Sequence, residues 1–213
     1  MMFGIIISAV SEVVSVAAKV LTTTLRVVGT NIVDFAKMLE SFFKAVGLLE
    51  ERDDIEELGD RALQAEEAGE LDPEQFDNYE EYMKKVREFD LDEARSKEIT
   101  SEEKLKKGVE LMTQLAVAHY GESTGTGLMT MAAENKDYFL DKGKLAEIGK
   151  LTKEGEAEVA DIVNYVAGKP QSTEKNDAAF ESLLRVEKDA DPERSIEEAM
   201  RAIIALRDKK EAE

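Results

Sequence analysis

The first 48 residues alternate polar and apolar positions with the period of an α-helix. One polar residue recurs per turn from Ser8 to Lys44, in ten steps over 36 residues, which is the repeat of a straight helix. The pattern predicts one helix over residues 5–48, or a two-helix hairpin that breaks at Gly29. The opposite side of this helix carries a stripe of ten large apolar residues, the N-terminal stripe: Val10, Val14, Leu21, Leu25, Val28, Ile32, Phe35, Leu39, Phe42 and Val46.

The apolar arc of this helix is wide, because Val13, Val16 and Val20 flank the N-terminal stripe. A helix of this kind must be covered on most of its sides. Three kinds of cover are compatible with the pattern. The helix is wrapped by later helices of the same chain, or it binds a second copy or a protein partner, or it lies in a membrane interface.

The remaining chain repeats the signals that begin and end helices. Thr100 and Glu103 form a capping box, and Asp72-Pro73 and Asp191-Pro192 each resemble a cap followed by proline at the first helical position. We find no strand-like alternation, so the sequence predicts an all-α helical bundle: a long hydrophobic N-terminal helix, or helical hairpin, and an acidic multi-helix body. In the last helix, one face is expected to hold Ile196, Met200, Ile203 and Leu206.

Charge divides the chain sharply. Residues 1–49 carry a net charge of +1 and the remaining residues hold −20, with eleven acids against two arginines between Glu50 and Asp72. Together with the glycines after Tyr120, this division predicts four segments. They are the hydrophobic helix at 1–49, an acidic helical region at 50–120, a glycine-rich joint at 121–127 and a C-terminal helical region at 128–213.

Composition excludes several classes of function. The 213 residues include no cysteine, which removes disulfides, thiolate nucleophiles and cysteine-based zinc sites. The net charge of −19 repels phosphate backbones, so we expect no direct binding to nucleic acid. No basic residue precedes the apolar N-terminus, so we recognise no secretory signal and expect a cytoplasmic protein or a component of a larger assembly.

Candidate chemistry is sparse. The single histidine, His119, cannot build a two-histidine metal site, and the Gly121–Gly127 stretch has neither the lysine nor the preceding strand of a phosphate-binding loop. Asp189-Ala190-Asp191 begins like a calcium loop, but Arg194 stands where such a loop needs glycine. The sequence therefore predicts no catalytic, cofactor-binding or metal-ligating residue.

The unusual feature is a long hydrophobic surface and not a convergence of reactive groups. We therefore expect a non-enzymatic structural or adaptor protein that assembles with itself or with a protein partner through residues 1–49, using the N-terminal stripe. The first alternative is a membrane-interface protein that uses the same helix. A remoter alternative is an acidic inhibitor or nucleic-acid mimic.

Overall fold

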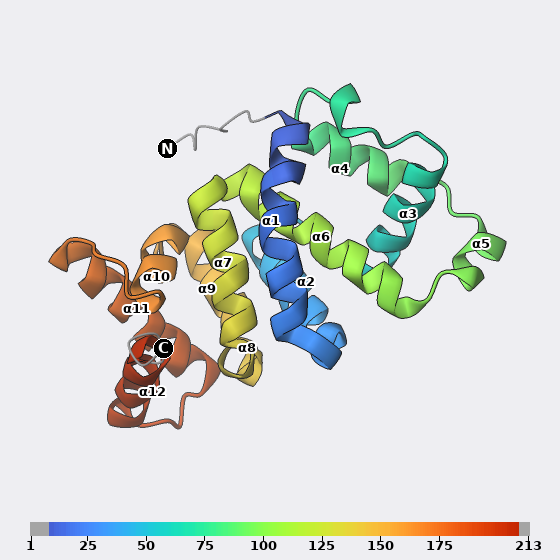
Figure 1. The fold of residues 1–213 in the computed structure, drawn as a ribbon. Coiled ribbons are helices and arrows are strands. Elements are labelled where there is room, and N and C mark those ends of the chain that lie inside the picture. Colours follow the sequence, from blue (N-terminus) through green and yellow to red (C-terminus); the bar gives the residue numbers. More distant parts are fainter. Residues whose placement is uncertain (1–8, 209–213) are drawn as a thin grey trace.

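A computed structural model describes residues 9–208 and shows an all-α protein that is 79% helical, as the sequence predicts (Figure 1). The described residues contain no strand. The α-helices are α1 (Val10–Val28), α2 (Ile32–Val46), α3 (Ile55–Glu67), α4 (Tyr79–Glu88), α5 (Glu93–Glu98), α6 (Ser101–Tyr120), α7 (Glu122–Glu134), α8 (Lys136–Leu140), α9 (Lys144–Lys153), α10 (Val159–Val166), α11 (Thr173–Ala190) and α12 (Ile196–Asp208), and the 3₁₀ turns are η1 (Gly29–Asn31), η2 (Pro73–Gln75) and η3 (Asp141–Gly143).

The N-terminal region forms two helices in succession and not one. Gly29 ends α1 with φ +57° and ψ −129°, a conformation that glycine adopts at little cost, and η1 leads from it into α2. At this break the chain changes direction, and α2 leaves the lower end of α1 without continuing its axis (Figure 1). The break at Gly29 is the one that the two-helix alternative predicts, and the single continuous helix is wrong; the predicted residues 5–8 lie outside the described part.

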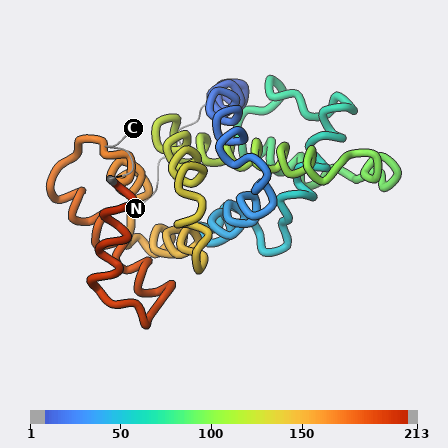
Figure 2. The backbone as a smooth tube through the Cα atoms, turned by 60° about the horizontal axis from the view of Figure 1, so that its bottom comes forward, coloured from blue at the N-terminus to red at the C-terminus, as the bar shows by residue number. Residues whose placement is uncertain are grey.

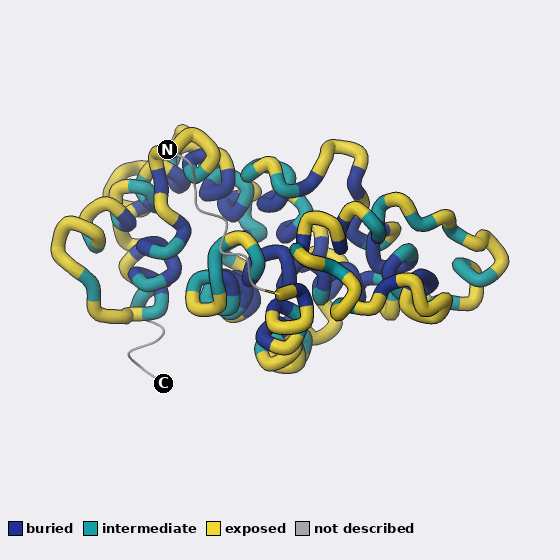
Figure 3. Tube along the Cα trace, turned by 90° about the horizontal axis from the view of Figure 1, so that it is seen from above, coloured by how far each residue is buried: buried dark blue, intermediate teal, exposed yellow. Residues whose placement is uncertain are grey.

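Both helices lie in the middle of the molecule. α1 packs on α6 and α7, and α2 packs on α9 and α6. Helices α3 to α5 lie at one end and α10 to α12 at the other (Figures 1 and 2). Buried positions line the helices of the middle, while the connecting turns are mostly exposed (Figure 3). One hydrophobic core thus joins side chains from the 1–49, 50–120 and 128–213 segments.

The capping prediction is right at Thr100, right only for a short turn at Asp72, and wrong at Asp191. The Thr100 hydroxyl accepts from the Glu103 amide at 3.2 Å, and the Glu103 carboxylate accepts from the Thr100 amide at 2.9 Å, as a capping box requires. Asp72 caps only the short turn η2, because the chain is extended again at Phe76. The last helix begins at a box formed by Ser195 and Glu198, and not at Asp191-Pro192.

The glycine-rich stretch is not a joint. α7 begins directly after Gly121, and residues 122–127 are already helical. A Cβ at Gly125 would lie 2.6 Å from the backbone of Ala116 and Val117, and one at Gly127 would lie 2.5 Å from Val163 Cγ1. These two glycines let neighbouring helices approach α7 closely, which explains their presence without any flexible loop.

The contact between α3 and α6 is equally close. A Cβ at Gly59 would lie 1.9 Å from the Lys104 carbonyl oxygen, and one at Gly108 would lie 2.2 Å from the Ile55 carbonyl oxygen. Beside them, Lys104 Nζ lies 2.7 Å from the buried carboxylate of Asp60. Burial alone would raise the pKa of Asp60, but its hydrogen bonds, chiefly from Lys104, outweigh burial and lower it.

Candidate functional site

The structure divides the N-terminal stripe into a core part and a partly exposed part. Six of its ten side chains are buried by the chain's own helices: Val10, Val28, Ile32, Phe35, Leu39 and Phe42. The other four are half-buried and pack against the edge of the core: Val14, Leu21, Leu25 and Val46. The six core residues cannot contact a partner while this fold is intact.

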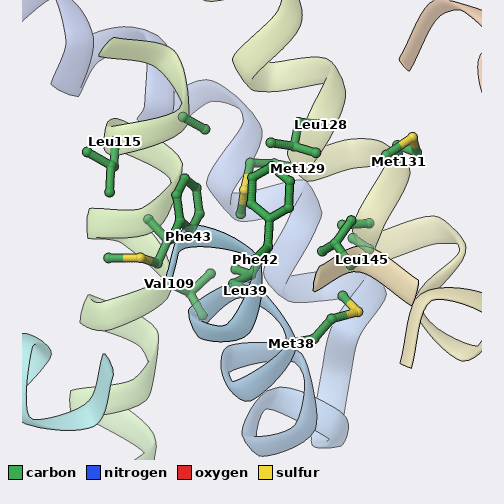
Figure 4. Close-up of a cluster of buried hydrophobic side chains, with 14 of the residues drawn as sticks. Met38, Leu39, Phe42, Phe43, Val109, Leu115, Leu128, Met129, Met131 and Leu145 are labelled. Carbon is green, nitrogen blue, oxygen red and sulfur yellow. The ribbon is translucent and has the colours of Figure 1, made fainter. Parts of the chain in front are cut away.

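The core part is held by aromatic contacts. Phe42 and Phe43 are fully buried and meet edge to face, with ring centroids 5.2 Å apart. Phe42 points toward Leu128 and Met129 of α7, while Phe43 lies on the side of α6 (Figure 4). Edge-to-face rings of this kind add stability beyond the area that they bury. Phe42 and Phe43 therefore hold α2 against α6, with Phe42 turned toward α7.

The partly exposed residues of α1 form one continuous strip, which we call the α1 flank: Val14, Ala18, Leu21 and Leu25. Their spacings of four, three and four residues place them on one side of the helix. Ala18 is exposed, and the other three are half-buried. Farther around α1, the exposed residues are mainly polar. The α1 flank is thus an apolar strip between the core and the polar surface of α1.

The segment Val10–Val46 is also long and apolar enough to be a candidate membrane span. Its most apolar stretch has a mean hydropathy of 1.3, yet only 28% of that stretch is buried inside the molecule. A core helix of a soluble protein is mostly buried, so this low fraction is unusual for such a helix. The break at Gly29 lies within the same segment.

The cavity beside α7 offers little chemistry. It has a volume of about 370 Å³ and lies between α7 and α10, with Ser123, Thr126 and Thr130 on one side and Val163 and Val166 on the other. The hydroxyls of Thr126 and Thr130 donate to carbonyl oxygens one turn earlier, at 2.7 Å and 3.0 Å. Hydroxyls bonded in this way are not activated nucleophiles, because no base accepts their protons.

His119 lies exposed near the end of α6. Its ring stands edge-on to Tyr120, with centroids 4.6 Å apart, and partial desolvation by this packing lowers its pKa. A general base needs a proton donor within hydrogen-bond reach. In the part of the chain that the structure describes, no carboxylate or hydroxyl is hydrogen-bonded to His119, and no group of three or more acidic or histidine side chains could hold a metal ion.

The sequence did not reveal a buried cluster of charges between α9 and α11. Lys144 Nζ lies 3.1 Å from Glu187 and 2.9 Å from Asp141, and Arg194 reaches Glu187 from the other side. The same ammonium stands 4.3 Å from the centroid of the Tyr138 ring. Lys144 and Glu187 are buried almost completely, so this cluster ties the C-terminal helices to the middle of the molecule.

The cluster is neutralised internally, which suits a structural role. Burial, with the nearby carboxylate of Glu187, raises the pKa of the Tyr138 hydroxyl, so Tyr138 stays protonated at neutral pH. The hydrogen bond from Lys144 lowers the pKa of Asp141. The sequence carried one weak signal of this burial. Lys144 and Glu187 each lie four residues from a buried aliphatic residue, and therefore on the same face of their helix as that residue.

No model of a protein family, no curated protein and no solved structure matches this chain.

Proposed function

We propose that the protein is a non-enzymatic adaptor, and that it binds a protein partner through the α1 flank. The observation that carries the proposal is the α1 flank, an apolar strip left partly uncovered in a segment of whose most apolar stretch only 28% is buried. Apolar surface that stays exposed on a helix is a common mark of a protein interface. The binding element is still the N-terminal helix, but the residues that contact the partner are those at the edge of the core and not those inside it.

The geometry of the α1 flank suits a partner helix. Val14, Leu21 and Leu25 recur at the spacing by which an amphipathic helix meets a second helix, and exposed Ala18 leaves room for a close approach. The charged residues Lys19 and Arg26 lie on the neighbouring polar face and remain in water. A partner would therefore bury apolar area on α1 without desolvating a charge.

A pair of glutamate variants on α1 tests the proposal. Ala18→Glu places a charge in the middle of the α1 flank, and Ser15→Glu places the same charge on the polar face; both positions are exposed. We expect the two variants to melt within about 2 °C of wild type, because exposed substitutions cost little stability. The immobilised wild-type chain is incubated with an extract of its own cells, and enriched proteins are quantified by mass spectrometry.

The expected result is a protein that wild type and Ser15→Glu enrich equally and that Ala18→Glu loses at least tenfold. Purified, that protein should bind wild type with a stoichiometric endpoint in calorimetry. Equal recovery by both variants would refute binding through the α1 flank, and so would the absence of any enriched protein.

The same observation supports one second candidate, a membrane-interface protein. An amphipathic helix can bury its apolar side in the headgroup region of a bilayer, and the Val10–Val46 segment meets the length and composition of a membrane helix. Flotation with vesicles of neutral lipid separates the two candidates. Wild type that floats, while Ala18→Glu stays in solution, would favour the membrane, since no protein partner is then present.

A further inference from the structure

The C-terminal helix α12 carries a second apolar surface, far from α1 in the fold. Ile196, Met200 and Ile204 recur every four residues and are 61%, 39% and 47% exposed. We call these three residues the α12 stripe. Ala199, Ile203 and Leu206, on the neighbouring side, are buried where α12 packs on α10 and α11. The single face expected from the sequence is therefore two faces, of which the fold covers one.

The position of α12 leaves the α12 stripe accessible. The helix lies at the margin of the molecule, beside α11 and at the opposite end from α3 to α5 (Figures 1 and 2). Exposed isoleucines in a regular row on one helix are uncommon on a monomer surface, where single apolar residues are scattered. The row is what remains uncovered after α12 has packed on the fold.

Local charge makes this end of the chain suited to a second copy. The whole chain has a net charge of −19, which opposes self-association across most of its surface. Helix α12, by contrast, holds three acidic residues and two arginines, a net charge of only −1. Two copies that meet at α12 therefore bring little net charge into the contact, and salt screens the distant acidic regions within about 8 Å at physiological ionic strength.

We propose that two copies of this chain form a symmetric dimer in which their α12 helices pack antiparallel along the α12 stripe. A two-fold axis through Met200 brings Met200 against its own copy. Ile196 and Ile204 are each four residues from Met200, so Ile196 of one copy faces Ile204 of the other. This is the self-complementary arrangement of a two-fold interface. The dimer uses a different surface from the α1 flank, and each can exist without the other.

The charges beside the stripe select the antiparallel direction. Glu197 and Arg201 are exposed, and they already form an ion pair one turn apart on α12. Measured along the helix axis, Arg201 of one copy and Glu197 of the other copy differ in position by about two residues, or roughly 3 Å. Two glutamates and two arginines then alternate in one cluster. Antiparallel helix dipoles favour the same direction.

The first test measures mass against concentration by sedimentation equilibrium in 0.15 M salt. We expect wild type to pass from 23.7 kDa toward twice that mass as the concentration rises through the micromolar range, since a contact between single helices is small. Met200→Glu sets two like charges on the axis and should weaken the dimer at least tenfold. Val33→Glu, at an exposed apolar position on α2, is the matched control and should leave the dimer unchanged.

The second test fixes the geometry. The chain has no cysteine, so under mild oxidation Met200→Cys should form a disulfide-linked dimer and Val33→Cys should not. Glu197→Arg and Arg201→Glu should each be monomeric alone and should form a mixed dimer together. A wild type that stays monomeric up to millimolar concentration overturns the proposal. So does a dimer that Met200→Glu leaves intact, or equal cross-linking at both cysteine positions.

Discussion

Replacing Lys144 with methionine should be among the most damaging single changes to this fold. The Lys144 side chain is only 2% exposed, and its ammonium lies 3.1 Å from Glu187, which is fully buried. Methionine keeps much of the length and apolar volume of the lysine stem but carries no charge. The substitution therefore leaves the Glu187 carboxylate buried with one cationic neighbour fewer.

The expected magnitude follows from this geometry. Removing one partner of a buried ion pair costs about 3–5 kcal/mol, because the other charge stays desolvated. Arg194 still contacts Glu187 in the variant, so we expect the lower end of that range, about 3 kcal/mol. For a chain of this length each kcal/mol lowers the melting temperature by about 2–4 °C, which predicts a fall of about 6–12 °C.

Lys150→Met is the matched control on the same helix. Lys150 pairs with Glu147 at 2.6 Å, but the lysine is 57% exposed, so its loss should cost less than about 1 kcal/mol. Urea denaturation followed by circular dichroism gives both free energies of unfolding. Adding Glu187→Gln to Lys144→Met should recover part of the loss, because the unpaired charge is then removed. Equal small losses in the two single variants would refute the burial of the cluster.

Three further predictions concern stability and membranes. Gly59→Ala should cost at least about 2 kcal/mol in urea denaturation, because its Cβ would lie 1.9 Å from the Lys104 carbonyl oxygen; a more stable variant would contradict this contact. The pKa values of Asp60 and Asp141 are lowered in the fold, so their ionised carboxylates stabilise it at pH values above the unfolded pKa of about 3.9, and this contribution should disappear as the pH falls below that value. Measurement of the free energy of unfolding from pH 7 to 3 checks the sign, and a gain in stability on acidification would be inconsistent with it. Any membrane binding by residues 1–49 should be weaker on anionic than on neutral vesicles, since the acidic body is repelled, and flotation that is strongest on anionic vesicles at low salt would reverse this ranking.

The sequence by itself determined the fold class, because the signals for helices are local. A 3.6-residue apolar repeat and a capping box act within one or two turns of chain. The start of α6 at Ser101, after the Thr100 cap, and its end before Gly121 could therefore be predicted from the residues alone. Local signals failed where two possible caps lie close together. Asp72 caps only a short turn, and Asn78 caps the helix α4 that follows, because the choice between the two depends on what that helix packs against.

Tertiary structure decided what each glycine does. Gly29 breaks a helix although the apolar repeat continues through it, because a short 3₁₀ turn preserves the period while it changes the backbone. Gly125 and Gly127 lie inside a helix, where a run of glycines suggested a loop. Their role depends on the backbone of α6 and a side chain of α10, which no spacing along the chain reports.

Tertiary structure also decided which apolar and charged positions are buried. The N-terminal stripe has one period, yet Phe42 lies in the core while Leu25 lies at its edge, and Ile203 is covered while Ile204 is exposed. Periodicity shows that a face must leave water but not what covers it, since hydrophobic burial has no preferred direction or partner. Lys144 and Glu187 become a pair only when α9 and α11 meet, because a charge tolerates burial only beside a countercharge that the fold brings to it.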